Sequence, residues 1–277
     1  MPTLPMRVIK LFCIAAVVFA LASCSVFKGR PNLNKLPVEK LYNVAHTDLQ
    51  NGSYMAAAKA YKRLIARFPF GKYNQEAQIE LAYAQYKDGK PDDAYSTINR
   101  FIKTYPAHKH IAYAYYLRGL INFGRSGHFA QEIFGRDARS RHDQGYRLES
   151  FDDFSKLTRR FPDSKYAADA RQRMIYLRNG LAQFEINVAE YYLRTRAYIA
   201  AAHRAKYVIQ HYQQAPQTGD ALAILAQCYK LLKMPKLAKQ SLAVLKLNYP
   251  DHPYLSDPDW PHSASTLRRM IPFSGHH

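Results

Sequence analysis

The feature that most constrains this chain is a helix ending that recurs along it. Four stretches with helical periodicity close on an aromatic residue followed directly by proline: Phe68-Pro69, Tyr105-Pro106, Phe161-Pro162 and Tyr249-Pro250. The aromatic ring can pack at the end of the helix, and the proline ends the helix because it has no N–H to donate and clashes with the preceding turn. Endings of one kind, repeated along the chain, indicate internal repeats.

The small and apolar residues before three of these prolines fit the spacing of the tetratricopeptide repeat, a helix–turn–helix unit of about 34 residues. Repeats that begin at Val38, Gln75 and Gly219 together fill 20 of 21 template positions, and Gln78 is the one mismatch. Alanine at the contact positions lets paired helices approach closely. Glycine-containing turns at 51–53 and 87–91 separate the two helices of the first two units.

We therefore expect an all-α fold, a right-handed α-solenoid of about five tetratricopeptide repeats in residues 38–254. The expected repeats span about 38–72, 75–108, 109–163, 165–217 and 219–252. The third span is too long for one repeat, so we place an insertion at 124–145. The fourth is expected to be distorted, because its terminal proline shifts to Pro216.

The amino terminus has the pattern of a secretory signal peptide, residues 1–23. Arg7 and Lys10 precede an apolar run at 11–22, which is shorter than the roughly 20 residues that a membrane-spanning helix needs. The sequence Leu21-Ala22-Ser23-Cys24 resembles the lipobox of bacterial lipoproteins. That resemblance implies cleavage before Cys24, which becomes an S-diacylglycerol, N-palmitoyl cysteine. The alternative is an ordinary signal peptide with a chance cysteine.

The residue after Cys24 and the net charge indicate where such a lipoprotein is located and what kind of partner it binds. Ser25, rather than the aspartate that retains lipoproteins in the inner membrane, favours the outer membrane, and residues 24–37 read as a lipidated tether. Removing Arg7 and Lys10 lowers the net charge only from +19 to +17, which favours anionic partners. The basic residues are spread over helices without base-stacking aromatics, so we discount nucleic acid.

Neither the remaining cysteine nor the carboxy-terminal segment indicates a chemical function. Cys228 is the only cysteine left in the mature chain apart from Cys24, and its apolar neighbours predict a small buried residue. Residues 255–277, with the chain's single tryptophan, Trp260, read as a flexible tail that a partner could order.

No enzyme signature withstands inspection, so we expect no catalytic residue. The Glu149-Ser150 pair is found in lytic transglycosylases, but here it falls inside a repeat helix and the other motifs of that fold are missing. Histidine pairs at 108/110 and 276/277 lack the further ligands that zinc needs. We therefore predict no metal and no cofactor other than the covalent lipid.

The 22 tyrosines are the most unusual part of the composition. Most are expected to fill interfaces between helices, where their hydroxyls stay wet. A minority on the first helices of repeats could line a peptide-binding groove, flanked by Arg100, Lys103 and Arg118. The pattern does not decide which tyrosines belong to such a groove.

Several segments of the solenoid resemble the BamD family, also called ComL or YfiO, the tetratricopeptide lipoproteins of the outer-membrane β-barrel assembly (Bam) complex. The segment near Phe134 is the most specific, because it lies in the insertion that ordinary repeats lack. The matching segments are 67–71 with Tyr73, 100–102, 116–120, 134–137, 153–157 and 188–192. The resemblance does not extend beyond Tyr254.

This resemblance implies a non-catalytic scaffold on the periplasmic face of the outer membrane. The family's amino-terminal repeats are thought to receive the carboxy-terminal signal of unfolded outer-membrane β-barrel proteins, and later repeats hold BamA and the lipoproteins BamC and BamE. Carried over by position, the candidate BamA contact is Arg204. The candidate substrate-peptide residues are Phe68, Phe70, Gly71, Tyr73, Arg100 and Lys103. A basic, aromatic surface suits a peptide that ends in an aromatic ring and a carboxylate.

A different scaffold lipoprotein, one that coordinates peptidoglycan enzymes of the cell envelope, stays open as the alternative. It would share the lipobox and the repeats but not the insertion.

Overall fold

The computed structural model describes residues 32–125, 141–257 and 260. The signal peptide, Cys24, the first part of the tether, most of the insertion at 124–145 and most of the tail lie outside these residues. None of the helices in the described ranges is long and apolar enough to cross a membrane.

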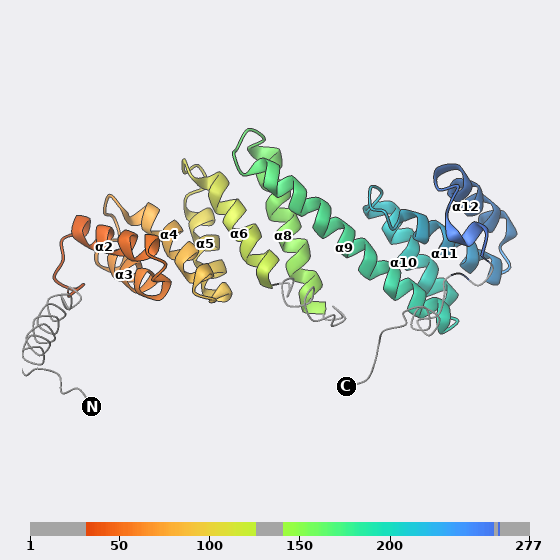
Figure 1. Ribbon diagram of the computed structural model, residues 1–277, viewed down its shortest axis with the longest axis horizontal. Helices are drawn as coiled ribbons and strands as arrows, with labels where there is room; N and C mark the ends of the chain where they lie inside the picture. Colours follow the sequence, from red (N-terminus) through yellow and green to blue (C-terminus); the bar gives the residue numbers. More distant parts are fainter. Residues whose placement is uncertain (1–31, 126–140, 258–259, 261–277) are drawn as a thin grey trace, which may run out of the picture. The chain divides into compact units, whose positions relative to one another are not determined.

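Residues 32–125 and 141–257 form a series of antiparallel α-helices, and no residue of these two ranges lies in a strand (Figure 1). The helices are α2 (Val38–Gln50), α3 (Tyr54–Arg67), α4 (Asn74–Lys87), α5 (Pro91–Thr104), α6 (Ile111–Arg125), α8 (Arg141–Arg160), α9 (Ala167–Arg194), α10 (Tyr198–His211), α11 (Thr218–Leu231), α12 (Pro235–Asn248) and the short 3-10 helix η2 (Pro253–Leu255). The predicted all-α, tetratricopeptide-repeat fold is confirmed.

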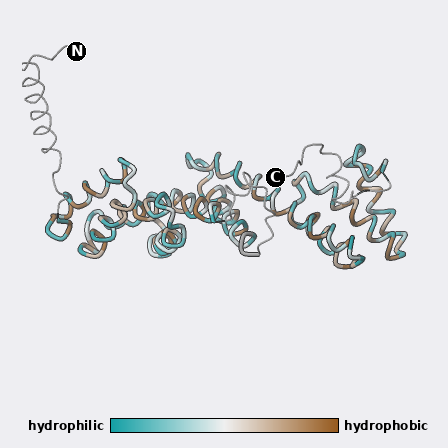
Figure 2. Tube along the Cα trace, turned by 60° about the horizontal axis from the view of Figure 1, so that its bottom comes forward, coloured by the Kyte–Doolittle hydropathy of each residue, from teal (hydrophilic) through white to brown (hydrophobic). Residues whose placement is uncertain are grey.

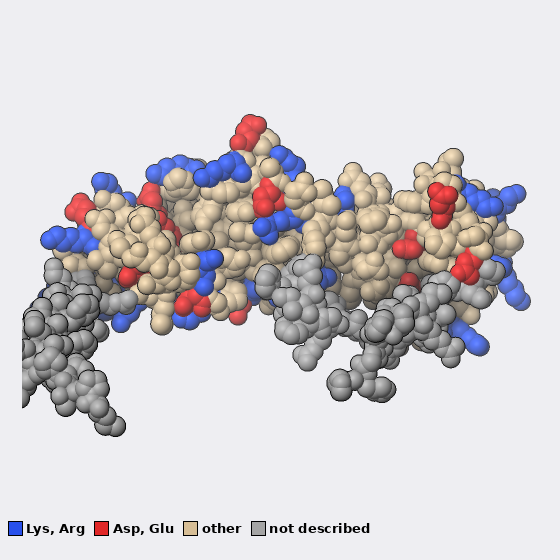
Figure 3. All heavy atoms as spheres, in the orientation of Figure 1, with Lys and Arg blue, Asp and Glu red and all other residues tan. Residues whose placement is uncertain are grey.

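The chain divides within α4 into two compact units, residues 1–84 and 85–277, which we describe separately. Within the units, neighbouring helices pack side by side: α2 on α3 in the first, and α5 to α12 in succession in the second (Figure 1). Apolar and polar residues alternate along the helices in both (Figure 2), as expected of helices that bury one face. Lys and Arg side chains are spread over many helices in the view of Figure 3.

The core of the first unit forms where α2, α3 and α4 meet. Its largest side chain is Tyr61, which is fully buried, and alanines occupy the closest contacts between helices. Ala45 and Ala57, two of the alanines that the repeat template requires, have no exposed surface. The buried set also includes Leu41, Ala58, Ala60, Leu64, Ala77, Leu81 and Ala84.

The last repeats of the second unit share a core of α9, α10, α11 and α12. Cys228 lies in it with no exposed surface, as predicted, and burial raises the pKa of its thiol to about 11. A thiol with such a pKa is almost entirely protonated near neutral pH, so it is a poor nucleophile.

Trp260 is also part of this core, which corrects its placement in a flexible tail. The indole is 8% exposed and makes edge-on contacts with His252 at 5.2 Å and with Tyr254 at 5.6 Å between ring centroids. His252 is held in turn by Asp220, whose Oδ1 lies 3.1 Å from Nε2. This segment thus packs on the apolar core of the last helix pair.

The turn between the two helices of a repeat has the same backbone geometry in four places. The second residue after the helix end takes a left-handed conformation: Gly52 and Gly89 at φ 73°, Arg196 at φ 62° and Lys233 at φ 58°. The following N–H donates to the carbonyl five residues back, as in Ser53 to Asp48 at 2.8 Å. This is the Schellman ending, which satisfies carbonyls at the end of a helix.

Lys233→Gly should raise the free energy of unfolding by roughly 0.5–1 kcal/mol, because a left-handed backbone is costly for a residue with a Cβ. Chemical denaturation of the purified protein measures the change. The matched control, Lys239→Gly within α12, should lower stability by about 1 kcal/mol. If both substitutions destabilise equally, the left-handed turn is not strained.

Candidate functional site

The Phe70 loop, residues 68–73, connects α3 to α4 and holds four of the six candidate peptide-binding residues. The carbonyl of Phe68 accepts hydrogen bonds from the N–H of Gly71 at 3.0 Å and from the side-chain amide of Asn74 at 3.1 Å. A Cβ at Gly71 would lie 3.1 Å from the Cβ of Phe68, so a larger residue there would require the loop to shift by a few tenths of an ångström. These bonds give the loop a defined shape.

Phe70 is fully exposed at the tip of this loop. Phe68 instead packs on the core of the first unit, with the guanidinium of Arg67 at 4.8 Å from its ring centroid. An exposed aromatic ring on a well-ordered loop is a common feature of recognition surfaces, because it offers large apolar contact area at little entropic cost.

Tyr73 ends the Phe70 loop in a stack of aromatic rings. Its ring is 4.5 Å from that of Tyr42 and nearly parallel to it, and Tyr42 meets Tyr61 edge-on at 6.2 Å. The hydroxyl of Tyr61 donates to Glu80 at 2.5 Å. Burial, reinforced by the Glu80 carboxylate, raises the pKa of both Tyr42 and Tyr61, so neither phenol ionises at neutral pH. Tyr73 therefore serves the core of this unit as well as the loop.

Arg100 and Lys103, the other two candidates, lie on α5 in the second unit. Both are exposed, and neither charged group pairs with an acid among the described residues. They are one helical turn apart, so they share a face of α5 and form a small cationic surface.

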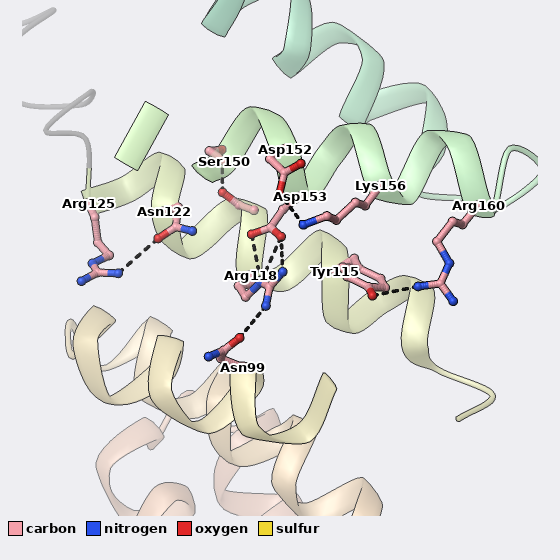
Figure 4. A network of polar contacts seen from close by, with 11 residues as sticks. Asn99, Tyr115, Arg118, Asn122, Arg125, Ser150, Asp152, Asp153, Lys156 and Arg160 are labelled. Atoms are coloured by element: carbon pink, nitrogen blue, oxygen red, sulfur yellow. Dashed lines mark hydrogen bonds and ion pairs between the residues drawn. The ribbon is translucent and has the colours of Figure 1, made fainter. Parts of the chain in front are cut away.

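Arg118 does not flank any groove, which corrects its expected role. Its guanidinium is buried between α5, α6 and α8, where Nε lies 3.0 Å from each carboxylate oxygen of Asp153 and Nη2 also bonds to Asp153 (Figure 4). Nη1 donates to the side chain of Asn99 at 2.6 Å. The exposed fractions are 12% for Arg118 and 3% for Asp153. This arginine is structural, because its donors are already used within the repeat.

Ser150 lies beside this ion pair and has a structural role too. It is fully buried, and its hydroxyl donates to the carbonyl of Gly119 at 2.9 Å (Figure 4). A Cβ at Gly119 would come within 2.6–2.9 Å of three ring atoms of Phe154, so α6 and α8 approach too closely there for any larger residue. Ser150 of the Glu149-Ser150 pair is thus accounted for by helix packing, whereas Glu149 is exposed.

Arg204 lies on α10 at the edge of a surface hollow in the second unit. Its guanidinium is about half exposed and is held 3.0 Å from Glu185 of α9. The Arg204 hollow is lined by Tyr192, Arg196, Ala197, Tyr198, Ile199, Ala200, His203, Arg204 and Leu232. A lining of apolar side chains and two arginines suits a protein partner that brings an acid and an apolar side chain.

Sequence patterns did not single out two neighbours of Arg204. Ile199 is 64% exposed at the start of α10, and Arg196 takes the left-handed turn position before it. Ile199 could have been recognised as a surface residue, because it lies outside the buried positions of the repeat. The turn at Arg196 has no signal in the sequence, because arginine is unfavourable in the left-handed conformation.

The family of the chain follows from comparison with known proteins. The model of the YfiO family, described as an outer membrane lipoprotein, matches residues 34–256. The chain belongs to the YfiO family. The match includes every helix from α2 to α12 and stops before Trp260.

The curated relatives of this chain include several outer membrane protein assembly factors named BamD. That of Xylella fastidiosa (strain Temecula1) is 45% identical over 240 residues, which cover 87% of this chain and 82% of the relative. That of Neisseria meningitidis serogroup B is 39% identical over 253 residues, covering 90% and 94%. Among solved structures, a thermophilic TPR protein of Thermus thermophilus is 15% identical, with a TM-score of 0.40 over 79% of this chain and 98% of that chain.

Arg118→Ala should lower the free energy of unfolding by about 3–5 kcal/mol, because it leaves the buried Asp153 carboxylate without its partner. Arg100→Ala, the same change on an exposed face, should alter it by less than about 0.5 kcal/mol. Urea denaturation followed by circular dichroism compares the two. A small effect of Arg118→Ala would mean that the ion pair is not essential to the third repeat.

Proposed function

We propose that this chain is an outer membrane protein assembly factor, a non-catalytic scaffold of the Bam complex that receives unfolded β-barrel proteins. The observation that carries the proposal is membership of the YfiO family together with 45% identity, over most of both chains, to an assembly factor named BamD. Of the transglycosylase-like pair, Ser150 is buried and bonded to the carbonyl of Gly119, which is a structural role.

The proposed anchor is the lipid on Cys24, which holds the protein at the periplasmic face of the outer membrane. Its support is the lipobox-like sequence at 21–24 and the family's description as an outer membrane lipoprotein. Two or more acyl chains hold a protein stably in a bilayer, where one gives only marginal binding.

We propose that the Phe70 loop contacts the apolar, aromatic part of the carboxy-terminal signal of a barrel protein. Phe70 supplies the exposed ring, while Gly71 and Phe68 fix the loop and Tyr73 ties it to the core. Arg100 and Lys103 are proposed as a contact for a peptide carboxylate, which both can pair with. The loop and the cationic face lie in different units, so they are proposed as two separate contacts.

The proposed contact for BamA is the Arg204 hollow. Arg204 is already oriented by Glu185, so little side-chain entropy is lost when a partner binds it. Exposed Ile199 adds apolar area beside it. BamC and BamE are further proposed partners, without an assigned surface.

Recovery of the complex tests this function against the peptidoglycan-scaffold alternative. The tagged chain, purified from detergent-solubilised membranes, is expected to retain BamA, as mass spectrometry would show. Recovery of peptidoglycan enzymes without BamA would overturn the assembly role. The alternative is not favoured, because the relatives named above are assembly factors.

Phe70→Ala should weaken binding of a barrel carboxy-terminal peptide by about tenfold, the effect of losing roughly 1.4 kcal/mol of apolar contact. Fluorescence anisotropy of the labelled peptide measures it, and stability should not change because the ring is fully exposed. Leu247→Ala, which removes another highly exposed apolar side chain, is the control and should bind normally. Equal affinity for the Phe70→Ala protein excludes the loop as a contact.

Arg204→Ala should reduce the BamA that co-purifies with the chain by at least about fivefold, because arginines at the centre of interfaces often contribute 1–2 kcal/mol or more. Quantitative immunoblotting of the pull-down measures the ratio. Arg171→Ala removes an exposed arginine from α9 and should leave the yield of BamA unchanged. A similar loss in both variants would point to net charge rather than to this surface.

A further inference from the structure

A second hollow lies on the first repeat, at the surface of α2 and α3, and the proposed assembly role does not use it. It encloses about 620 Å³ and is bordered by the chain segment just before α2. Figure 3 shows Lys and Arg side chains over these first helices. The Lys59 hollow is lined by Asn32, Leu33, Asn34, Val44, Asp48, Ala56, Lys59, Lys62, Arg63 and Ala66.

The hollow combines positive charge with a single carboxylate. Lys59 and Arg63 are exposed, one turn apart on α3, and neither pairs with an acid among the described residues. Lys62 adds a third cation to the lining, and half-buried Asp48 of α2 adds the carboxylate. Val44 and Ala56 contribute apolar surface to the same lining. The lining therefore suits a small ligand that carries a phosphate and an ammonium together.

The position of the hollow relative to the proposed anchor is set by Arg67. Its Nη1 donates to the carbonyls of Leu33 at 2.8 Å and of Leu36 at 2.9 Å, which fixes the segment before α2 against α3. The residues that separate this fixed segment from the proposed anchor are those between Cys24 and Asn32. Eight residues span at most about 26–29 Å when fully extended. The Lys59 hollow is bordered by Asn32 itself, so it stays within that distance of the lipid on Cys24.

We propose that the Lys59 hollow binds the phosphoethanolamine headgroup of a phospholipid in the leaflet that carries the anchor. Lys59 and Arg63 pair with the phosphate, and Asp48 pairs with the ammonium. A phosphatidylglycerol headgroup offers no cation to Asp48, and an acidic peptide would place carboxylates against it. The inference rests on the proposed lipid anchor for its geometry.

Vesicle binding by the full mature chain with Cys24→Ser tests this, because that variant cannot be held by its own lipid. Co-sedimentation with vesicles of phosphatidylethanolamine and a minor part of phosphatidylglycerol gives the affinity. Lys59→Glu with Arg63→Glu should weaken it at least about tenfold, given roughly 1 kcal/mol for each basic residue at a membrane surface. Lys236→Glu with Lys239→Glu on α12 makes the same change in net charge and should weaken it less than about twofold.

Titration with a short-chain phosphatidylethanolamine, inorganic phosphate or a glutamate-rich peptide identifies the ligand. We expect saturable binding of the short-chain lipid only, and Asp48→Asn should abolish its preference over short-chain phosphatidylglycerol. The proposal would be overturned if the two double variants lost vesicle affinity equally, or if Asp48→Asn kept its preference for phosphatidylethanolamine over phosphatidylglycerol. It would also be overturned if phosphate or the peptide bound more tightly than the short-chain lipid. Unchanged melting temperatures verify folding. Recovery of BamA tests the assembly role independently, so failure of one does not imply failure of the other.

Discussion

Close approach of helices through alanine is the constraint on which this structure depends. A helix that buries one face must find a partner for it, and a small residue at the crossing brings two backbones near enough for the larger side chains around it to interlock. Ala45 and Ala57 do this in the first unit, and Ala201 and Ala205 in the second, all without exposed surface. Gly119 takes the same principle further, since even a methyl group would collide there with Phe154.

This way of packing leaves loops and turns, besides the exposed faces of helices, available for the proposed contacts. The helices bury their alanine-rich faces against one another, whereas the loops between repeats and the turns within them are free of that demand. Phe70 is on such a loop, and the Arg204 hollow is bordered by the turn at Arg196. A scaffold of this kind can therefore change partners by changing a few turn residues while its core stays the same.

The fold was predictable because its signals are local. Proline endings, alanine spacing and the glycine turns at Gly52 and Gly89 each report on a stretch shorter than one repeat. What failed depends on contacts distant in sequence. Arg118 looked available because its partner, Asp153, is 35 residues away, and Trp260 looked mobile because its contacts come from the end of the last repeat. The turn at Lys233 could not be predicted, because a lysine there adopts the left-handed backbone conformation that glycine adopts at 52 and 89. For the candidate site residues, the structure gives the exposed fraction and the neighbours of each side chain, and the roles are proposed.

The two hydrogen bonds from Arg67 to the segment before α2 have a consequence for how strongly a weak ligand is bound. With the proposed lipid on Cys24, so short a tether would hold the first repeat among headgroups at a high effective concentration, in the manner of a second binding event within one molecule. Under that condition a site with only millimolar intrinsic affinity would be occupied most of the time. Loosening the Arg67 contacts would lengthen the tether and dilute the headgroups that the first repeat meets, and it would also release Leu33, which lines the hollow.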